Sequence, residues 1–265
     1  MKGDLAGIRS VLFLPASNAR AIGHARESAA DLVILDLEDA VKPADKDSAR
    51  SAAVEAVAEG WPMPVAIRVN GVGTDWHPLD VDAVARSKAD YAVLPRAVSG
   101  HDVRELGEAV GRPVLGMVET AAGVLAAAEI AREAAALVAG TNDLRADLRI
   151  PAGTDRSSIA MAIQSIVLAA RANGIAAFDG VFNDLDDLDG FAAQCAEGRA
   201  LGFDGKTLIH PRQVEACNRS FSPGEEEIAR ARRLVAAYGG GAERFEGEMI
   251  EQMHVDAARR LLDRR

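Results

Sequence analysis

Cysteine is scarce in this sequence. Only Cys195 and Cys217 occur, and neither belongs to a CxxC motif or stands at metal-ligand spacing from a histidine. Both lie in helix-like surroundings, where a free cysteine behaves as a small hydrophobic residue. We therefore interpret both as buried packing residues and assign them no metal or redox role.

The chain also lacks a surplus of positive charge and lacks long apolar runs. Its 30 basic residues are outnumbered by 40 acidic ones, so no general positive field attracts phosphates, and we expect neither a nucleic-acid nor a membrane partner. No stretch reaches the roughly 18 apolar residues that a membrane span needs. The N-terminal segment MKGDLAGIRSVLFLP is too polar for a signal peptide. We therefore expect a cytoplasmic protein.

The motifs of several common site types are missing as well. There is no GxSxG elbow, and the string Gly71–Val72–Gly73 lacks the strand and helix context of a dinucleotide site. The acidic cluster at 184–189 does not have the spacing of an EF-hand loop and leads directly into a helix. We interpret that cluster as a solvated turn that caps the helix.

Short apolar runs alternate with longer, Ala-rich segments along most of the chain. A chain of 265 residues, 49% of them hydrophobic, can bury one large core. Runs rich in Val, Ile and Leu predict eight strands, at 8–14, 32–37, 65–69, 91–94, 114–118, 136–139, 175–177 and 206–209. Helical patterns lie between many of them, at 19–30, 47–58, 121–134, 156–172 and 188–201. This alternation predicts an α/β fold, a (β/α)8 TIM barrel formed by residues 1–238.

The composition changes after residue 221. Ser222, Pro223 and Glu225 predict the N-cap, the first position and the capping-box partner of a further helix. That helix ends at Gly239–Gly240–Gly241, which we interpret as a hinge. Residues 245–265 then place apolar side chains beside many charges, the pattern of an amphipathic helix. We expect residues 239–265 to be a C-terminal helical arm that packs on its own barrel or on a neighbouring subunit.

Polar residues follow almost every predicted strand. A (β/α)8 barrel carries its active site at the carboxyl ends of its strands. Those positions hold Ser17, Asn18, Glu38, Asp39, Arg68, Asn70, Arg96, Glu119, Asn142, Asp143, Asp179 and His210. Helix capping explains single carboxylates among them, but it explains the convergence of all of them poorly. We therefore expect the active site to be built from this set.

A metal ion is the simplest partner for so many carboxylates. Carboxylates around one opening repel one another and raise each other's pKa unless a cation neutralises them. Oxygen ligands without a His or Cys cluster favour Mg²⁺, or Mn²⁺, over zinc. Glu119 and Asp143 follow the neighbouring fifth and sixth strands, and we predict that they are the ligands. Arg68 offers a planar cation for a substrate carboxylate, or it forms a salt bridge with Glu38 or Asp39.

Nine strings of residues, in order along the chain, carry a family resemblance. They are SVLFLPASN at 10–18, VILDLEDAV at 33–41, IRVNG at 67–71, VLPRA at 93–97, MVETAAGV at 117–124, AGTNDL at 139–144, DGVFND at 179–184, GFDGKTLIHPRQV at 202–214 and FEGEMIE at 245–251. Together they cover nearly the whole chain and resemble the citrate lyase beta-subunit-like members of the HpcH/HpaI aldolase/citrate lyase family.

The resemblance implies a fold, a cofactor and a chemistry. Members are (β/α)8 barrels with a C-terminal extension, usually trimers or hexamers, in which the extension contributes to a neighbour's active site. They cleave or form carbon–carbon bonds in CoA esters, with Mg²⁺ held by residues that match Glu119 and Asp143 and with a substrate-binding arginine that matches Arg68. We expect the substrate to contact Phe13, Asn18, Arg20, Arg68, Glu119, Asn142, Ile209 and His210.

The sequence departs from the family pattern in two places. Lyases of the malyl-CoA type carry basic residues, which help to hold CoA, where this chain has Asn18 and His24, and Arg20 is the candidate replacement. The catalytic aspartate of the C-terminal extension corresponds to Glu251. A glutamate keeps the carboxylate and is longer by one methylene, so acid–base function is compatible with this change.

Three functions follow as hypotheses. The first is a Mg²⁺-dependent lyase that cleaves or forms malyl-, citramalyl- or citryl-CoA by retro-Claisen or retro-aldol chemistry. In it Arg68 binds negative charge, and Glu251 moves the proton with Glu38 or Asp39 in reserve. The second is a malyl-CoA thioesterase or a malate-synthase-like enzyme at the same site. The third is a non-catalytic subunit that binds a CoA ester, and the retention of Arg68 with the two proposed metal ligands argues against it.

Overall fold

Eight parallel strands form a closed barrel in sequence order, with β1 paired to both β2 and β8. The structure is a computed structural model that describes residue 5 and residues 7–263. The strands are β1 (Ser10–Pro15), β2 (Leu32–Asp36), β3 (Val65–Arg68), β4 (Tyr91–Leu94), β5 (Val114–Val118), β6 (Ala136–Ala139), β7 (Ala176–Asp179) and β8 (Gly205–Leu208). Each lies within two residues of its predicted bounds, so the TIM-barrel prediction is confirmed.

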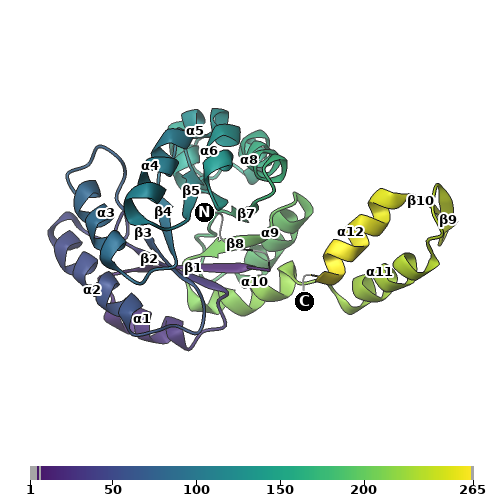
Figure 1. The fold of residues 1–265 in the computed structure, drawn as a ribbon, viewed down its shortest axis with the longest axis horizontal. Coiled ribbons are helices and arrows are strands. Elements are labelled where there is room, and N and C mark those ends of the chain that lie inside the picture. Colours follow the sequence, from purple (N-terminus) through teal and green to yellow (C-terminus); the bar gives the residue numbers. More distant parts are fainter. Residues whose placement is uncertain (1–4, 6, 264–265) are drawn as a thin grey trace.

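Helices surround the barrel (Figure 1). They are α1 (Ala19–Arg26), α2 (Lys46–Ala58), α3 (His77–Arg86), α4 (Gly100–Val110), α5 (Ala121–Leu125), α6 (Ala127–Glu133), α7 (Thr141–Asp147), α8 (Ala160–Ala172), α9 (Leu188–Ala200) and α10 (Val214–Phe221). The helix predicted at 121–134 is two helices, which meet at Ala126. Within the described residues, no helix combines the length and the apolar character that crossing a membrane requires.

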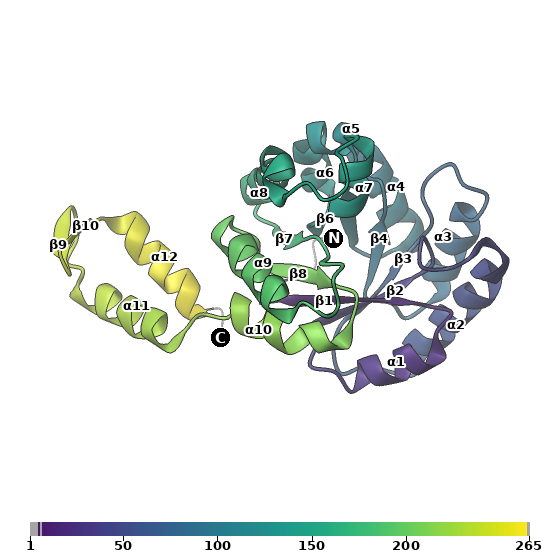
Figure 2. The same ribbon diagram turned by 180° about the vertical axis from the view of Figure 1, so that it is seen from behind.

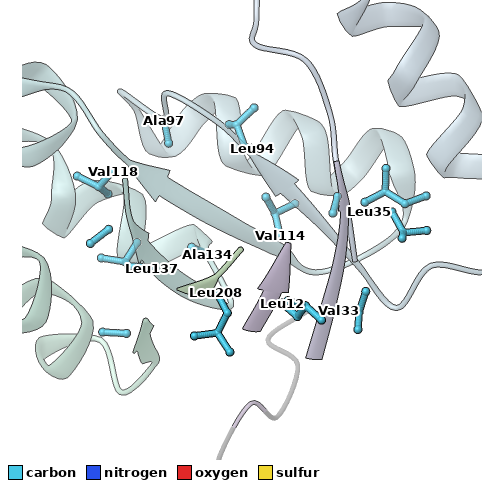
Figure 3. Packing of buried hydrophobic residues seen from close by; sticks show 14 of the residues in the cluster. Leu12, Val33, Leu35, Leu94, Ala97, Val114, Val118, Ala134, Leu137 and Leu208 are labelled. Carbon is cyan, nitrogen blue, oxygen red and sulfur yellow. The ribbon is translucent and has the colours of Figure 1, made fainter. Parts of the chain in front are cut away.

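The strands place their side chains alternately inside and outside the barrel. One buried cluster, which includes Ile34, Ala66 and Phe178, fills the interior. A larger cluster, which includes Val33, Leu35 and Leu137, lies between the strands and the helices (Figure 3). Successive strand residues point to opposite faces. A polar residue at a strand end therefore faces the barrel opening only if it continues the series of inward-facing residues of that strand.

The two cysteines lie in the outer cluster, as predicted from their surroundings. Cys195 on α9 and Cys217 on α10 are free thiols with no exposed surface. The Cys217 thiol lies 3.3 Å from the carbonyl oxygen of Arg9. Both side chains therefore contribute to the packing of the helices against the barrel.

The C-terminal residues form an arm that projects from the barrel beside α10 (Figures 1 and 2). It consists of α11 (Glu225–Ala237), the hairpin strands β9 (Glu243–Phe245) and β10 (Glu248–Ile250), and α12 (Gln252–Asp263). The two helices pack through a separate apolar cluster formed by Ala231, Leu234, Ile250, Val255 and Ala258. This cluster joins residues on both sides of the expected boundary at residue 238.

Two expectations about this region are wrong. The N-cap of α11 is Gly224, whose N–H donates to Glu227 at 2.7 Å. Ser222 ends α10 instead, because its hydroxyl accepts from Arg9 and donates to the carbonyl oxygen of Asn218. The glycine run at 239–241 is the turn between α11 and β9, so the chain leaves the barrel near residues 222–224 and not at these glycines.

Candidate functional site

A cavity of about 430 Å³ opens at the carboxyl ends of the strands. Both charged and apolar side chains line it, among them Phe13, Asp36, Asp39, Arg68, Met117, Glu119, Asn142, Asp143, Thr207 and Ile209. A second cavity of about 470 Å³ shares Phe13 and Ile209 with the first and extends over Asn18, Arg20, His24 and His210. Two adjoining spaces at the barrel mouth suit a ligand with two chemically different parts.

Arg68 is the buried cation of the first cavity. It continues the inward-facing positions of β3, and its Nε and Nη2 donate to the two carboxylate oxygens of Asp36 at 2.6 and 2.7 Å. Its Nη1 lies 2.8 Å from Glu38, and its guanidinium carbon lies 5.0 Å from the centre of the Phe13 ring. Burial opposes the charge on Arg68, but the Asp36 carboxylate more than compensates and raises the pKa of Arg68. The guanidinium is therefore a permanent, oriented positive charge.

Asp36 holds more than the arginine. Its oxygens also accept the N–H groups of Glu38 and Ala40, at 2.9 and 3.1 Å. The same carboxylate thus orients Arg68 on β3 and shapes the turn that follows β2. Of the two salt-bridge partners that the sequence suggests for Arg68, Glu38 forms the ion pair. The bidentate partner is Asp36, which is not among the predicted residues.

Glu38 is a buried carboxylate beside Arg68. Its side chain is buried, and its Oε2 lies 2.8 Å from Arg68 but accepts no well-aligned hydrogen bond from the described residues. Burial raises the pKa of Glu38 to about 8, against the attraction of Arg68, and the nearby charge of Asp39 adds to the rise. A carboxyl group with a pKa near neutrality can both give and take a proton at physiological pH.

Glu119 is positioned by backbone from two neighbouring segments. Its Oε1 accepts the N–H of Arg96 at 2.6 Å, and Arg96 adopts a φ of 48°, an unusual conformation for a residue other than glycine. On the other side, the carboxylate lies against Gly140: a Cβ on that glycine would be 2.3 Å from Glu119 Oε2. Gly140 is therefore required because the carboxylate occupies the place of a side chain.

The charge of Glu119 is incompletely balanced. Burial raises its pKa to about 7, which outweighs the hydrogen bond from Arg96 and the attraction of Arg68, and Asp143 adds repulsion. Asp143 lies in the first turn of α7 and lines the same cavity. Among the described residues, no three His, Cys, Asp or Glu side chains are grouped as a closed metal cage. Two carboxylates in an open cavity fit Mg²⁺, which keeps several waters or substrate oxygens as ligands.

A model of the HpcH/HpaI aldolase/citrate lyase family matches residues 9–211. The chain belongs to this family. A (3S)-malyl-CoA thioesterase of Cereibacter sphaeroides is 41% identical to it, over 96% of this chain and 93% of the relative. The citrate lyase subunit beta of Escherichia coli is 33% identical, over 97% of this chain and 92% of the relative.

Solved structures of the family have the same fold. The crystal structure of CitE from Mycobacterium tuberculosis in complex with magnesium, acetoacetate and coenzyme A has a TM-score of 0.84 to this chain at 34% identity, and the match covers 98% of each chain. A citrate lyase beta subunit of the same organism, complexed with oxaloacetate and magnesium, has a TM-score of 0.75 and covers 83% of this chain and 98% of its own. The resemblance that the nine sequence strings indicate is thus confirmed.

The structure brings most of the predicted site residues of this family member together. The first cavity collects Phe13, Asp39, Arg68, Glu119, Asn142, Asp143 and Ile209. The second collects Asn18, Arg20 and His210. Two of these side chains also have local structural roles, because Asn18 caps α1 by accepting from Ala21 and the His210 ring accepts from the N–H of Arg212.

Several other residues of the predicted set line neither cavity, among them Ser17 and Glu38. Arg96 lines a separate cavity with Val98 and Asp102, and Asn70 is buried among Lys46, Leu37 and Asp80. Asp179 faces the helices, where it pairs with Arg156 and with the fully buried Lys206, whose Nζ is 2.8 Å away. The alternation along β7 explains this, since Phe178 points into the barrel and Asp179 therefore points out. Glu251 is exposed and lies between β10 and α12. Figures 1 and 2 show that the β9–β10 hairpin is at the end of the arm far from the barrel.

Two asparagines at the barrel mouth bind each other, and only one of them is in the predicted set. Asn142 and Asn183, from the segments after β6 and β7, exchange two amide hydrogen bonds of 3.2 and 2.8 Å. Only Asn142 was in the predicted set. Asn183 lies four residues after the end of β7, too far along the chain for the strand-end pattern to mark it.

Proposed function

We propose that this protein is a Mg²⁺-dependent carbon–carbon lyase that cleaves or forms a 3-hydroxy acyl-CoA ester such as malyl-, citramalyl- or citryl-CoA. The observation that carries the proposal is the placement of Arg68, Glu119 and Asp143 in one cavity. The relatives support the same chemistry, because one is a citrate lyase subunit and a related structure contains magnesium, acetoacetate and coenzyme A. The cavity over Asn18, Arg20 and His24 is the candidate place for the CoA part.

Glu119 and Asp143 would hold the Mg²⁺. The raised pKa of Glu119 supports this role, since burial leaves its negative charge without a full counterion. When bound, the ion would supply Lewis acidity to the oxygen atoms of an oxoacid unit and would help to orient that unit. Mn²⁺ has similar ligand preferences and is an alternative.

The protein's own residues would then act on the substrate as follows. Cleavage removes the proton of the 3-hydroxyl group, breaks the bond between C2 and C3 and leaves negative charge on the thioester oxygen of the acyl part. Arg68 would bind that oxygen or the substrate carboxylate, because its guanidinium is oriented by Asp36 and lines the cavity. Glu251 would take the hydroxyl proton and return a proton to C2 of the acyl part, with Glu38 or Asp39 as the nearby alternative.

Glu251 would have to come from a neighbouring subunit. The 13 residues of α11 alone correspond to about 20 Å of helix, and Glu251 follows the hairpin at the far end of the arm. In this arrangement it is remote from the cavity of its own chain. We therefore propose a homotrimer or hexamer in which each arm completes the site of a neighbour.

A complementation experiment tests this sharing. Glu119→Gln subunits and Glu251→Gln subunits, each inactive, are mixed under conditions that permit subunit exchange, and exchange is verified by mass spectrometry. Sharing predicts that activity partly returns, because some sites then contain both intact carboxylates. Verified exchange without any return of activity would mean that Glu251 acts within its own chain or has no chemical role.

A thioesterase is the second candidate function. The specific observation in its favour is the 41% identity to a (3S)-malyl-CoA thioesterase. In that reaction, water attacks the thioester carbonyl and the free acid leaves with free CoA, whereas a lyase releases an acyl-CoA and an oxoacid. A malate-synthase-like reaction at this site would combine formation of the carbon–carbon bond with hydrolysis of the thioester.

Product analysis separates these functions. Malyl-, citramalyl- and citryl-CoA are each incubated with the enzyme and Mg²⁺, and free thiol and oxoacid are measured in the same samples. Oxoacid without free thiol supports the lyase, and free thiol without oxoacid supports the thioesterase. Binding of the esters without either product would support the third hypothesis, a subunit that binds a CoA ester without catalysis.

A further inference from the structure

Lys46 is a buried lysine whose ammonium group donates three hydrogen bonds. The residue begins α2 and is 5% exposed. Its Nζ donates to the carbonyl oxygens of Leu37 and Glu38 and to Oδ1 of Asn70, each at 2.7 Å. An ammonium group has three donor hydrogens, so these three acceptors satisfy it. All three acceptors are neutral oxygens. Burial of a charged ammonium group is costly, and it lowers the pKa of Lys46.

These contacts hold the turn that presents Glu38 and Asp39 to the site. β2 ends at Asp36, and the turn that follows it also has backbone hydrogen bonds from Leu37 to Arg68 and from Val41 to Glu38. Asp36 binds the N–H groups of Glu38 and Ala40, whereas Lys46 binds the carbonyl groups of Leu37 and Glu38. The turn is thus held through its N–H groups on one side and through its carbonyl groups on the other.

The same lysine connects the Glu38 turn to the segment that follows Arg68. Asn70 accepts from Lys46 and donates to the carbonyl oxygen of Leu37 and to Asp80, at 3.0 and 2.6 Å. The backbone N–H of Asn70 also donates to Asp80. Because Arg68 lies only two residues before Asn70, this buried network couples the position of the arginine to the position of the Glu38 turn.

We propose that Lys46 is a positioning residue of this active site: it holds the Leu37 and Glu38 carbonyl groups so that the Glu38 carboxylate meets Arg68, which lines the cavity. Lys46 does not line the cavity and acts only through Glu38 and its neighbours. The inference rests on the proposed function in so far as that function gives Glu38 a part in the reaction.

The test compares Lys46→Met with Lys42→Met. Methionine fills a similar volume without donors, and Lys42 is an exposed lysine of the same segment, so it serves as the matched control. Hydrogen exchange of the Glu38 and Ala40 amides should become at least tenfold faster in Lys46→Met and should not change in Lys42→Met. In Lys46→Met, amide exchange in β5 and β6 should stay within threefold of the wild-type rates. The affinity for Mg²⁺ alone should also stay within threefold, because Glu119 and Asp143 are on the other side of the barrel mouth.

A kinetic cycle tests whether Lys46 acts through Glu38. Lys46→Met should lower kcat at least tenfold with little change in KM, and this loss should be much smaller when Glu38 is already glutamine. An equal loss in both backgrounds would overturn the proposal, as would unchanged amide exchange in the turn. Lys46→Gln, which keeps an amide donor, should show the same pattern with smaller factors and replaces the methionine variant if that variant does not fold. Hydrogen exchange needs no substrate, so it tests Lys46 even if no CoA ester is turned over.

Discussion

Glu38→Gln is the substitution that most sharply tests the electrostatics of the cavity. Glu38 is 8% exposed, and its pKa of about 8 means that burial outweighs the ion pair with Arg68. Glutamine has nearly the same shape and no charge, while Asp36 remains as the bidentate partner of Arg68. We therefore expect the variant to be more stable than the wild-type protein at neutral and alkaline pH.

The magnitude and its pH window follow from the raised pKa. Between the ordinary value of 4.5 and about 8, the folded protein binds a proton at Glu38 that the unfolded chain has released. Stability therefore falls as the pH rises through this window, and the cost is absent below pH 4.5. A difference of one pKa unit corresponds to about 1.4 kcal/mol. The cost is thus roughly 5 kcal/mol above pH 8 and roughly 3 kcal/mol at pH 7.

Urea unfolding of the wild-type protein and of Glu38→Gln at several pH values between 4.5 and 8.5 measures this effect. We expect the variant to gain stability relative to the wild type as the pH rises, and the two proteins to be similar at pH 4.5. Glu55→Gln, at an exposed glutamate on α2, is the control and should show no such trend. If Glu38→Gln is equally stable or less stable at pH 8.5, the ion pair with Arg68 outweighs burial and the reasoning is refuted.

Two other substitutions test the geometry of the cavity. Arg68→Lys should lower kcat/KM at least 100-fold, roughly 3 kcal/mol, because an ammonium group cannot bind Asp36 in bidentate fashion and still face the substrate; steady-state kinetics measures this, and near-normal values would leave Arg68 with a structural role only. Gly140→Ala should weaken Mg²⁺ binding and lower stability by about 1–3 kcal/mol, since the new Cβ would collide with Glu119. Gly23→Ala, on α1 with free space around it, is its control, and calorimetry together with thermal unfolding would show whether the two variants differ.

The barrel could be predicted from the sequence because its signals are local. Each strand is a short apolar run, and even the short β6 and β7 were present where the pattern indicated them. The start of α11 was assigned wrongly because Ser222 has the residue type of an N-cap, but its hydroxyl is bound by Arg9, which is 213 positions away. A contact between residues so distant in sequence leaves no local pattern.

The candidate site could be predicted only in part, because the sequence marks where a strand ends but not which way each side chain points. Its residues at strand ends, such as Glu119 and Asp143, could be found by position alone, but the direction of each side chain depends on the parity of the strand. Asp36 is the last residue of β2 and points inward, whereas Asp179 is the last residue of β7 and points outward. Lys46 lies on a helix, and its role emerges only when the turns after β2 and β3 are placed together.

Titration with Mg²⁺ tests the central claim, that Glu119 and Asp143 form the metal site of this cavity. Isothermal calorimetry without substrate would compare the wild-type protein with Glu119→Gln, Asp143→Asn and the control Asp186→Asn, an exposed aspartate outside the cavity. We expect one Mg²⁺ site per chain in the wild-type protein and in Asp186→Asn, and at least a 100-fold loss of affinity in the other two variants with the fold retained. Wild-type affinity in both Glu119→Gln and Asp143→Asn would contradict the assignment of the metal site to this cavity.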